Sequence, residues 1–378
     1  MTTYLLYDDA VRSPEMRHEL GKAIGDDVLF FEHDGRGIVV GSVLEAAIFE
    51  GRDDIEFWSS ADLGSRELIA DKLFPEGLIH PEIARRALEK LGSPAVTVPA
   101  TFRVSAADYL RDHDIDVIVD QDAWQMRRRA KSASELEGIN RAQGAAESAM
   151  QVASRMLRES TSGGNGILVF EGATLTAEII RAAMVDELLR CGAESEDILV
   201  HSGDACLRGH DLGSGPILKD QSCIIDCFPR DRASGCFSDL TRTFVPGTPS
   251  AELTALHGHC LRALEIALES VKVGTAEAHA RVTEYFHLNG YPTGDHHDGP
   301  KPLTEGFFHG LGHGVGLQVH EKPWIGRRAD AFVSGDVIAL EPGLYFAGVG
   351  GVRLEDTVVI TDDGCRHLAA PLSYGLAP

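Results

Sequence analysis

The alternation of hydrophobic and polar positions predicts a small α/β domain in about the first 125 residues of the chain. Apolar runs typical of strands occur at Val28–Glu32, Gly37–Val43, Ala95–Val98 and Asp116–Val119. Segments with helical periodicity lie between them, at Ser65–Phe74, Pro81–Leu91 and Ser105–His113. No glycine-rich phosphate-binding loop follows any of these strands, so we assign no chemistry to this domain.

The rest of the chain has a different order of elements. Helical patterns are expected at Ser134–Arg158, Thr176–Cys191, Ala251–Val271 and Ala276–Leu288. Strands are expected at Ile198–His201, Cys223–Phe228, Cys236–Val245, Phe307–Gly312, Leu317–His320, Val337–Leu340, Gly343–Phe346 and Val352–Ile360. Helices, a hairpin, helices and further hairpins predict an α+β domain with an antiparallel sheet covered by helices on one side. The two hairpin regions also hint at an internal two-fold duplication.

A basic stretch, Arg127–Lys131, separates the two regions. Ser134 followed by Glu137 is a capping-box pattern, which predicts the start of a long helix. A basic patch could form a ligand site, but we favour a solvated linker at a domain boundary. The expected domains are therefore residues 1–130 and 131–378.

Composition narrows the classes of protein and partner. With 378 residues, 43% hydrophobic and 25% charged, the chain is long enough for two globular domains. The formal net charge of −23 disfavours nucleic acid and anionic membranes as partners. No run of about 18 apolar residues occurs, and the N-terminus lacks the pattern of a signal peptide. We therefore expect a protein without a membrane span.

The seven cysteines are scattered and form no CxxC pair. This usage favours reduced, mostly buried thiols and a cytoplasmic location. Cys223 and Cys227 could suggest a zinc site, but no second Cys/His pair at zinc spacing lies beside them.

Five ionisable residues stand out in the second domain. Asp226, Asp239, Glu341 and Glu355 lie in apolar, strand-like segments, and His313 lies in a glycine-rich run. A carboxylate buried in an apolar strand is costly unless a cation compensates it. Each residue alone is more easily explained as structural, but together they form an oxygen-plus-nitrogen set that could hold two divalent cations. Two such cations can share a hydroxide, which suits hydrolysis.

Four segments carry a family resemblance: SDLTRTF, HGLGHGVGLQVHE, EPGLYF and GGVRLED. They resemble the signature blocks of the prolidase/aminopeptidase P branch of the M24 metallopeptidases, which are Xaa-Pro peptidases related to methionine aminopeptidase and creatinase. The likeness covers roughly residues 134–370. It implies a pita-bread fold in the second domain, a creatinase-like N-terminal domain, a homodimer and a dinuclear metal centre.

The resemblance also implies a role for each of the five residues. Asp226 would bind one cation terminally, Asp239 and Glu355 would bridge the two, and His313 and Glu341 would bind the other. Creatinase-type enzymes lack these ligands, so their presence argues against that activity. Since four of the five ligands are carboxylates, Mn²⁺ is the expected metal, with Co²⁺, Zn²⁺ and Fe²⁺ as alternatives.

Further residues match positions that face the substrate in this family. His320 would hydrogen-bond the scissile carbonyl or the developing oxyanion, and Glu341 would move a proton to the leaving group. His309 matches the additional histidine of the Xaa-Pro branch, and His210 matches a histidine that lines the substrate pocket. Arg353 matches an arginine near the metals. A pocket for proline must recognise the shape of its ring, which Phe307, Phe308 and Tyr345 could do.

The sequence departs from the family pattern in one place. Asp226 and Asp239 are thirteen positions apart, two more than usual, and the familiar DxG is replaced by DCFPRDRASG. An insertion of two residues preserves the alternation of a strand, so both carboxylates should still face the site. The hairpin tip, Pro229–Gly235, would instead reshape the mouth of the pocket.

These observations predict a metallopeptidase that hydrolyses the Xaa-Pro bond of dipeptides or at the N-terminus of longer peptides. Two alternatives stay open. One is a C–N hydrolase acting on a small non-peptide metabolite, and the other is a non-catalytic pita-bread binding module.

Overall fold

The computed structural model describes residues 2–209 and 211–378. The chain divides into two compact units, Met1–Arg128 and Arg129–Pro378. Each unit buries hydrophobic clusters of its own. No helix in the described ranges is both long and apolar enough to cross a bilayer.

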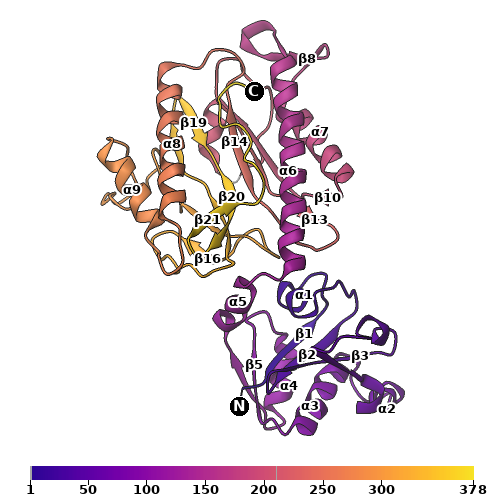
Figure 1. The fold of residues 1–378 in the computed structure, drawn as a ribbon. Coiled ribbons are helices and arrows are strands. Elements are labelled where there is room, and N and C mark those ends of the chain that lie inside the picture. The colour runs from indigo at the N-terminus through magenta and orange to yellow at the C-terminus, as the bar shows by residue number, and fades with distance from the viewer. Residues whose placement is uncertain (1, 210) are drawn as a thin grey trace. The chain divides into compact units, whose positions relative to one another are not determined.

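The smaller unit contains a mixed six-stranded sheet (Figure 1). The strands, in spatial order, are β4 (Ile55–Ser59), β3 (Arg36–Gly41), β2 (Val28–His33), β1 (Tyr4–Asp8), β5 (Ala95–Val98) and β6 (Asp116–Val119). The helices are α1 (Pro14–Leu20), α2 (Ser65–Ala70), α3 (Ile79–Leu91), α4 (Val104–Arg111) and α5 (Gln121–Arg129). The sequence pattern missed β1, β4, α1 and α5.

The expectation of a solvated linker at Arg127–Lys131 is wrong. Arg127 pairs with Glu19 and Glu32 in the smaller unit, both at 2.5 Å. In the larger unit, Lys131 Nζ lies 2.8 Å from Glu321 Oε1, and both side chains are almost fully buried. Acidic partners distant in the sequence compensate these charges, and a local charge pattern cannot reveal them.

The capping box of the long helix α6 (Ala133–Glu159) lies two residues before the expected one. Ser132 is the N-cap: its side chain accepts a hydrogen bond from the backbone N–H of Glu135, whose carboxylate accepts one from the N–H of Ser132. Ser132 and Ser134 each precede a glutamate by three positions. The spacing alone therefore could not distinguish the two serines.

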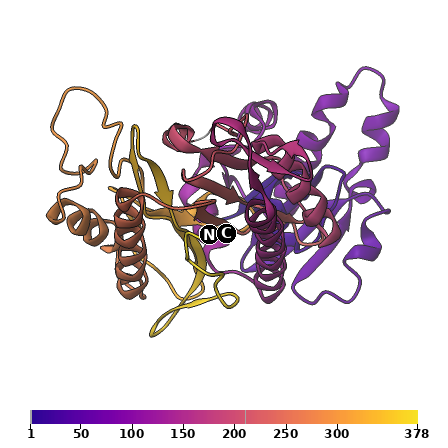
Figure 2. The ribbon, with the colours of Figure 1, turned by 90° about the horizontal axis from the view of Figure 1, so that it is seen from above.

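The larger unit consists of two similar halves, each with a pair of helices and antiparallel strands. In the first half α6 and α7 (Ala177–Arg190) pack on the sheet β11 (Ile198–Ser202), β12 (Cys223–Cys227) and β14 (Leu240–Phe244). In the second, α8 (Ala251–Ser270) and α9 (Ala278–Leu288) pack on a five-stranded sheet and a hairpin. Helices α6 and α8 flank the strands of this unit (Figures 1 and 2).

The second half has more strands than the sequence pattern predicted. Its sheet has the order β16 (Glu321–Ile325), β15 (Gly312–Gly314), β17 (Val337–Leu340), β20 (Asp356–Thr361) and β21 (Gly364–His367), and its hairpin is β18 (Gly343–Phe346) with β19 (Gly350–Arg353). Residues 308–311 and 317–320, expected in strands, are bends or irregular structure, and Phe307 forms only an isolated bridge with Thr293. The expected strand Val352–Ile360 is divided between β19 and β20, and Glu355 lies at the division.

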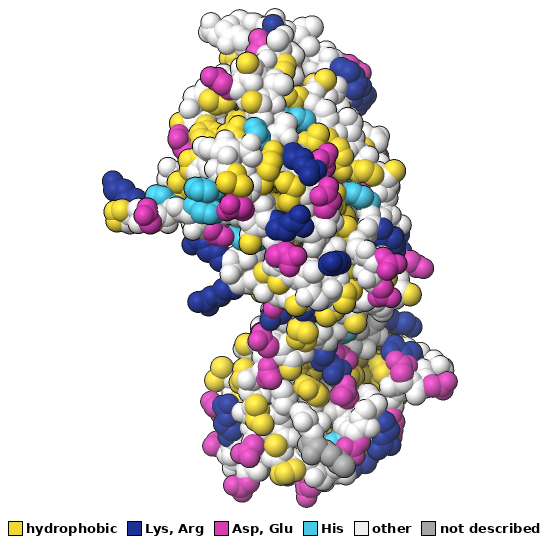
Figure 3. Space-filling view, turned by 60° about the vertical axis from the view of Figure 1, so that its left-hand side comes forward, with side chains coloured by type: hydrophobic (Ala, Val, Ile, Leu, Met, Phe, Trp, Pro, Cys, Tyr) yellow, Lys and Arg dark blue, Asp and Glu magenta, His cyan; other side chains and the backbone are white. Residues whose placement is uncertain are grey.

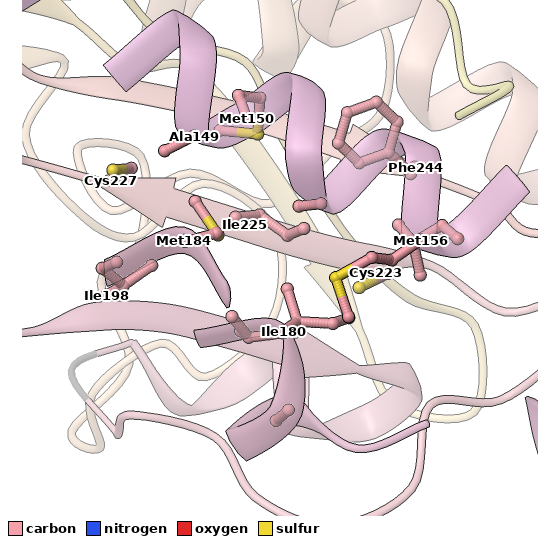
Figure 4. Packing of buried hydrophobic residues seen from close by; sticks show 14 of the residues in the cluster. Ala149, Met150, Met156, Ile180, Met184, Ile198, Cys223, Ile225, Cys227 and Phe244 are labelled. Atoms are coloured by element: carbon pink, nitrogen blue, oxygen red, sulfur yellow. The ribbon is translucent and has the colours of Figure 1, made fainter. Parts of the chain in front are cut away.

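Strand β12 shows how the core orients the site. Cys223, Ile225 and Cys227 belong to one buried cluster with Met150 of α6 and Met184 of α7 (Figure 4). Because side chains alternate along a strand, Asp226 points to the opposite face of the sheet. Burial also raises the pKa of the Cys227 thiol well above its usual range, and Cys223 and Cys227 both belong to the buried core on the face of β12 away from Asp226.

Charged side chains are distributed over the surface. On the face drawn in Figure 3, acidic and basic groups are interspersed, and no continuous basic area is visible there.

Candidate metal centre and substrate cleft

The hairpin β12–β14 brings the first two carboxylates to one face. The register pairs Asp226 with Thr241. Asp239 lies two residues before Thr241 and therefore has the same orientation. The two additional residues between the aspartates thus leave the strand alternation intact.

A second pair of ladders places the two glutamates opposite each other. The pairing of β17 with β20 ends at Leu340 and Asp356, and that of β18 with β19 resumes at Gly343 and Arg353. Glu341 and Glu355 fall between the two ladders at matching positions. Neither is inside a regular strand, and their backbone N–H groups donate instead to the carbonyls of Leu311 and Thr241.

His313 comes from β15, where neighbouring backbones approach closely. A Cβ atom on Gly312 would lie 1.9 Å from the carbonyl oxygen of Ala339, and one on Gly314 would lie 2.2 Å from that of Lys322. Only glycine fits at both positions. The pairing with β16 also shifts in register between His313 and Gly314, an irregularity of the kind that directs a side chain towards a site.

These elements gather the five predicted ligands. Asp239, His313 and Glu355 each offer an atom within 4.8 Å of those of the other two. His313 Nε2 lies 3.7 Å from Asp239 Oδ2 and 3.9 Å from Glu341 Oε1. Asp226 lies beside them and is held by Arg353, whose Nη2 is 2.6 Å from its Oδ2.

The electrostatics of this group favour bound cations. Burial and neighbouring carboxylates raise the pKa of Asp239 and of Glu355 well above their ordinary values, and burial raises that of Glu341 to about 7. Burial lowers the pKa of His313 to about 4, so the imidazole is neutral and can act as a ligand. The buried Oδ1 atoms of Asp226 and Asp239 have no hydrogen-bond partner in the described structure. The donor set therefore fits divalent cations that prefer oxygen and imidazole ligands.

Two threonines support the proposed metal ligands, and the sequence pattern gives no indication of this role. Thr241 Oγ1 donates a hydrogen bond to Glu355 Oε2 at 2.6 Å. Thr357 Oγ1 accepts one from the backbone N–H of Asp239 and donates one to its carbonyl oxygen. The only signal in the sequence was their spacing: Thr241 follows Asp239 by two positions, and Thr357 follows Glu355 by two positions. Such partners orient the residues that bind a metal.

A cavity of about 460 Å³ adjoins the five proposed ligands and is lined by five other predicted residues: Phe308, His309, His320, Tyr345 and Arg353. His320 packs its ring against that of His313, with centroids 4.2 Å apart. Tyr345 lies between His309 and Arg353, at 3.1 Å and 3.2 Å from its hydroxyl. Phe308 completes an aromatic wall with Tyr345, whereas Phe307 is buried in the core beneath.

His210 lies outside the described residues, although Gly209 and Leu212 on either side of it line the cavity. The hairpin tip Pro229–Gly235 does not contribute to the described lining; only Phe228, just before it, does. Within the tip, β13 (Arg230–Asp231) pairs with β10 (Ala193–Glu194), and Asp231 pairs with Arg141. The tip is thus attached to helix α6 and not directly to the cavity wall.

A second group of acids, in the smaller unit, has a simpler explanation. Asp8, Asp9 and Asp27 lie close enough together to hold a cation. However, Arg103 lies 2.5 Å from Asp27 and 3.5 Å from Asp8, and Arg12 lies 2.5 Å from Asp9. Arginine side chains compensate these carboxylates.

Comparison with known proteins identifies the class. The profile of metallopeptidase family M24 matches residues 137–362, and the chain belongs to this family of hydrolases. The resemblance inferred from the sequence motifs is therefore confirmed.

Curated relatives include the Xaa-Pro dipeptidase of Pyrococcus furiosus, 33% identical over 192 residues, which are 50% of this chain and 52% of that protein. The uncharacterized peptidase YqhT of Bacillus subtilis is 32% identical over 47% of this chain and 48% of its own. A probable dipeptidase, PepE of Mycobacterium tuberculosis, is 30% identical over 50% of this chain and 56% of its own length. The chain spans about half the length of the curated relatives that it matches.

Solved structures match almost the whole chain. The prolidase of Pyrococcus furiosus superposes with a TM-score of 0.73 at 21% identity, covering 99% of this chain and 97% of that one. The X-Pro aminopeptidase of Thermotoga maritima gives 0.74 at 22% identity, with the same coverage. The predicted pita-bread fold with an N-terminal domain is confirmed.

Proposed function

We propose that this protein hydrolyses the bond between an N-terminal residue and proline, in dipeptides or longer peptides. The observation that carries the proposal is the cavity itself, where the five acidic and imidazole side chains meet His309, His320 and an aromatic wall. Relatives named Xaa-Pro dipeptidase and a structural neighbour named X-Pro aminopeptidase support this substrate class.

In this proposal Asp226, Asp239, His313, Glu341 and Glu355 hold two divalent cations, with Mn²⁺ as the metal that the carboxylate-rich set favours. When bound, such cations polarise a carbonyl and lower the pKa of water. Arg353 orients Asp226 through their short ion pair and links it to Tyr345. Thr241 fixes one oxygen of Glu355.

The remaining residues act on the peptide. His320 would donate a hydrogen bond to the oxygen of the scissile carbonyl as negative charge develops there. Glu341 is the carboxylate placed to accept a proton from water and pass it to the proline nitrogen as the C–N bond breaks. His309, Phe308 and Tyr345 would enclose the proline ring, whose nitrogen has no N–H to recognise.

The wider assignment follows the same proposal. We propose that residues 1–130 form the creatinase-like domain and residues 131–378 the catalytic domain. We also propose that the enzyme acts as a homodimer in the cytoplasm. The division of the chain near residue 128 supports the proposed domains, and the free cysteines are consistent with the proposed cytoplasmic location.

A peptide panel tests the substrate class. After chelation and reloading with a defined metal, the protein should hydrolyse Ala-Pro or Ala-Pro-Yaa peptides and leave Met-Ala-Yaa peptides intact. Release of the N-terminal amino acid, followed by chromatography, is the measurement. If the Mn²⁺-loaded protein ignores every Xaa-Pro peptide yet hydrolyses another amide, the substrate assignment is wrong.

A further inference from the structure

A second cavity, of about 310 Å³, shares two wall residues with the catalytic cleft. Phe308 and His309 line both cavities. The other walls come from α9, from the loop that follows it and from the turn that carries Arg327. Its volume is at the lower end of that of small-molecule sites.

Two polar side chains of α9, those of His279 and Thr283, line this cavity and carry atoms without a hydrogen-bond partner. Thr283 is 1% exposed and His279 is 5% exposed, and they lie one helical turn apart. Neither Thr283 Oγ1 nor His279 Nδ1 makes a hydrogen bond in the described structure. Asp295 Oδ2 is 3.2 Å from His279 Nε2, which is ion-pair distance without hydrogen-bond alignment. A buried polar group left unsatisfied costs about 1–3 kcal/mol, so these atoms call for a partner.

The charges around the cavity compensate one another. Arg327 Nε lies 2.6 Å from Asp295 Oδ1, so each charged group of the wall has an opposite charge beside it. Burial lowers the pKa of His279, which favours the neutral form of its ring. The groups that need partners are thus a hydroxyl and a neutral imidazole. They match a small uncharged group that can both donate and accept hydrogen bonds, such as a hydroxyl or a carboxamide.

We propose that this cavity is a subsite for the side chain of the residue that follows proline, selective for serine, threonine, asparagine or glutamine. The inference rests on the proposed function, in which His309 contacts the proline ring. Because His309 and Phe308 separate the two cavities, the residue attached to that proline is the one nearest the second cavity. Thr283 and His279 would then determine specificity for tripeptides and longer peptides.

Tripeptide kinetics test the subsite. The metal-loaded enzyme should hydrolyse Ala-Pro-Ser and Ala-Pro-Asn with kcat/KM about tenfold above that for Ala-Pro-Leu, the scale of one or two net hydrogen bonds. Thr283→Val preserves the shape of the side chain and removes its hydroxyl, and His279→Leu removes the imidazole. Both variants should lose the preference while keeping the rate on Ala-Pro and the metal content of the wild type. Thr254→Val, at an exposed position of α8, is the matched control and should retain the preference.

A binding measurement covers the case in which a variant does not fold. The product dipeptides Pro-Ser and Pro-Leu would occupy only the part of the cleft that binds proline and the residue after it. Calorimetry on the wild-type holoenzyme should therefore show about tenfold tighter binding of Pro-Ser than of Pro-Leu. Equal affinities, or a preference that survives in both folded variants, would overturn the subsite while leaving Xaa-Pro hydrolysis in place. Failure to hydrolyse any Xaa-Pro peptide would overturn the proposed function and the subsite together.

Discussion

At the scale of single residues, the site is a set of buried charges that cannot be stable one by one. Asp239 is 4% exposed and Glu355 is 2% exposed, and each lies near other carboxylates. A single arginine, Arg353, lies among them. Isolated burial of such groups would cost several kcal/mol. Bound cations would compensate this cost, and the two residue-level predictions below follow from that requirement.

The two proposed bridging ligands should be indispensable. Asp239→Ala or Glu355→Ala is expected to abolish hydrolysis and to reduce bound metal to one equivalent or less, because each side chain would contact both cations. Elemental analysis of the purified variants measures the metal directly. Two tightly held ions in either variant would contradict the assignment.

His320 should affect the rate and not the metals. His320→Ala is expected to lower kcat by about 10²–10³, the scale of losing one oxyanion donor. The comparison is steady-state kinetics on Ala-Pro together with metal analysis. A variant that loses metal would identify His320 as a ligand and place the role of His313 in question.

At the scale of elements, specific side-chain interactions stabilise individual helices. Helix α6 carries much of the core of the larger unit and begins at a reciprocal cap made by Ser132 and Glu135. In the smaller unit, α3 carries Glu82, which binds Arg85, Arg86 and Tyr109. Each of these local arrangements makes a measurable contribution to stability.

The cap of α6 can be tested with a neighbouring serine. Ser132→Ala should lower the free energy of unfolding by about 1 kcal/mol, because it leaves an N–H of the first turn unsatisfied. Ser134→Ala removes the serine that the sequence pattern favoured, and its effect should be within about 0.5 kcal/mol. Urea unfolding of the two variants provides the comparison. Equal losses would contradict the assigned cap.

Glu82 should make the smaller unit sensitive to acid. Burial alone would raise its pKa, but hydrogen bonds from Arg85, Arg86 and Tyr109 outweigh this effect and lower the pKa to about 2. Because the folded-state pKa lies below the unfolded value of about 4.3, the stabilisation is present above that value and is lost as the pH falls towards 2.

Glu82→Gln tests this acid sensitivity. The variant should lose stability at pH 7 and show a smaller further loss between pH 5 and pH 3 than the wild type does. Glu89→Gln, at an exposed position of the same helix, is the control. Thermal unfolding followed at several pH values is the measurement, and identical pH profiles for Glu82→Gln and the wild type would rule the prediction out.

At the scale of the whole molecule, the metals should couple activity to stability. A ligand that binds only the folded state raises the melting temperature, and removing it lowers that temperature. Chelation is expected to abolish hydrolysis and to lower the melting temperature of the larger unit, because its carboxylates would then repel one another. Adding Mn²⁺ back should restore both. Calorimetry with and without chelator measures the effect, and an unchanged melting temperature would contradict it.

The sequence by itself determined the order of most elements and the chemistry of the site. Hydrophobic periodicity is a local property, so Ala95–Val98, Asp116–Val119, Val337–Leu340 and Gly343–Phe346 agree with their strands residue for residue. Strand alternation is local as well, and it placed Asp226 and Asp239 on one face despite the insertion between them. The motifs around them were sufficient to indicate the family.

Only the tertiary structure decided which charges are paired and which cavities adjoin. Arg129 binds Asp336, 207 positions away, and Arg353 binds Asp226 across 127 positions. Glu341 faces Glu355 because two separate ladders share one register. His279 is an ordinary helical residue in sequence and faces the second cavity only in the fold. The physical reason is that burial and electrostatic pairing depend on distances between side chains, which chain folding sets and local sequence patterns do not encode.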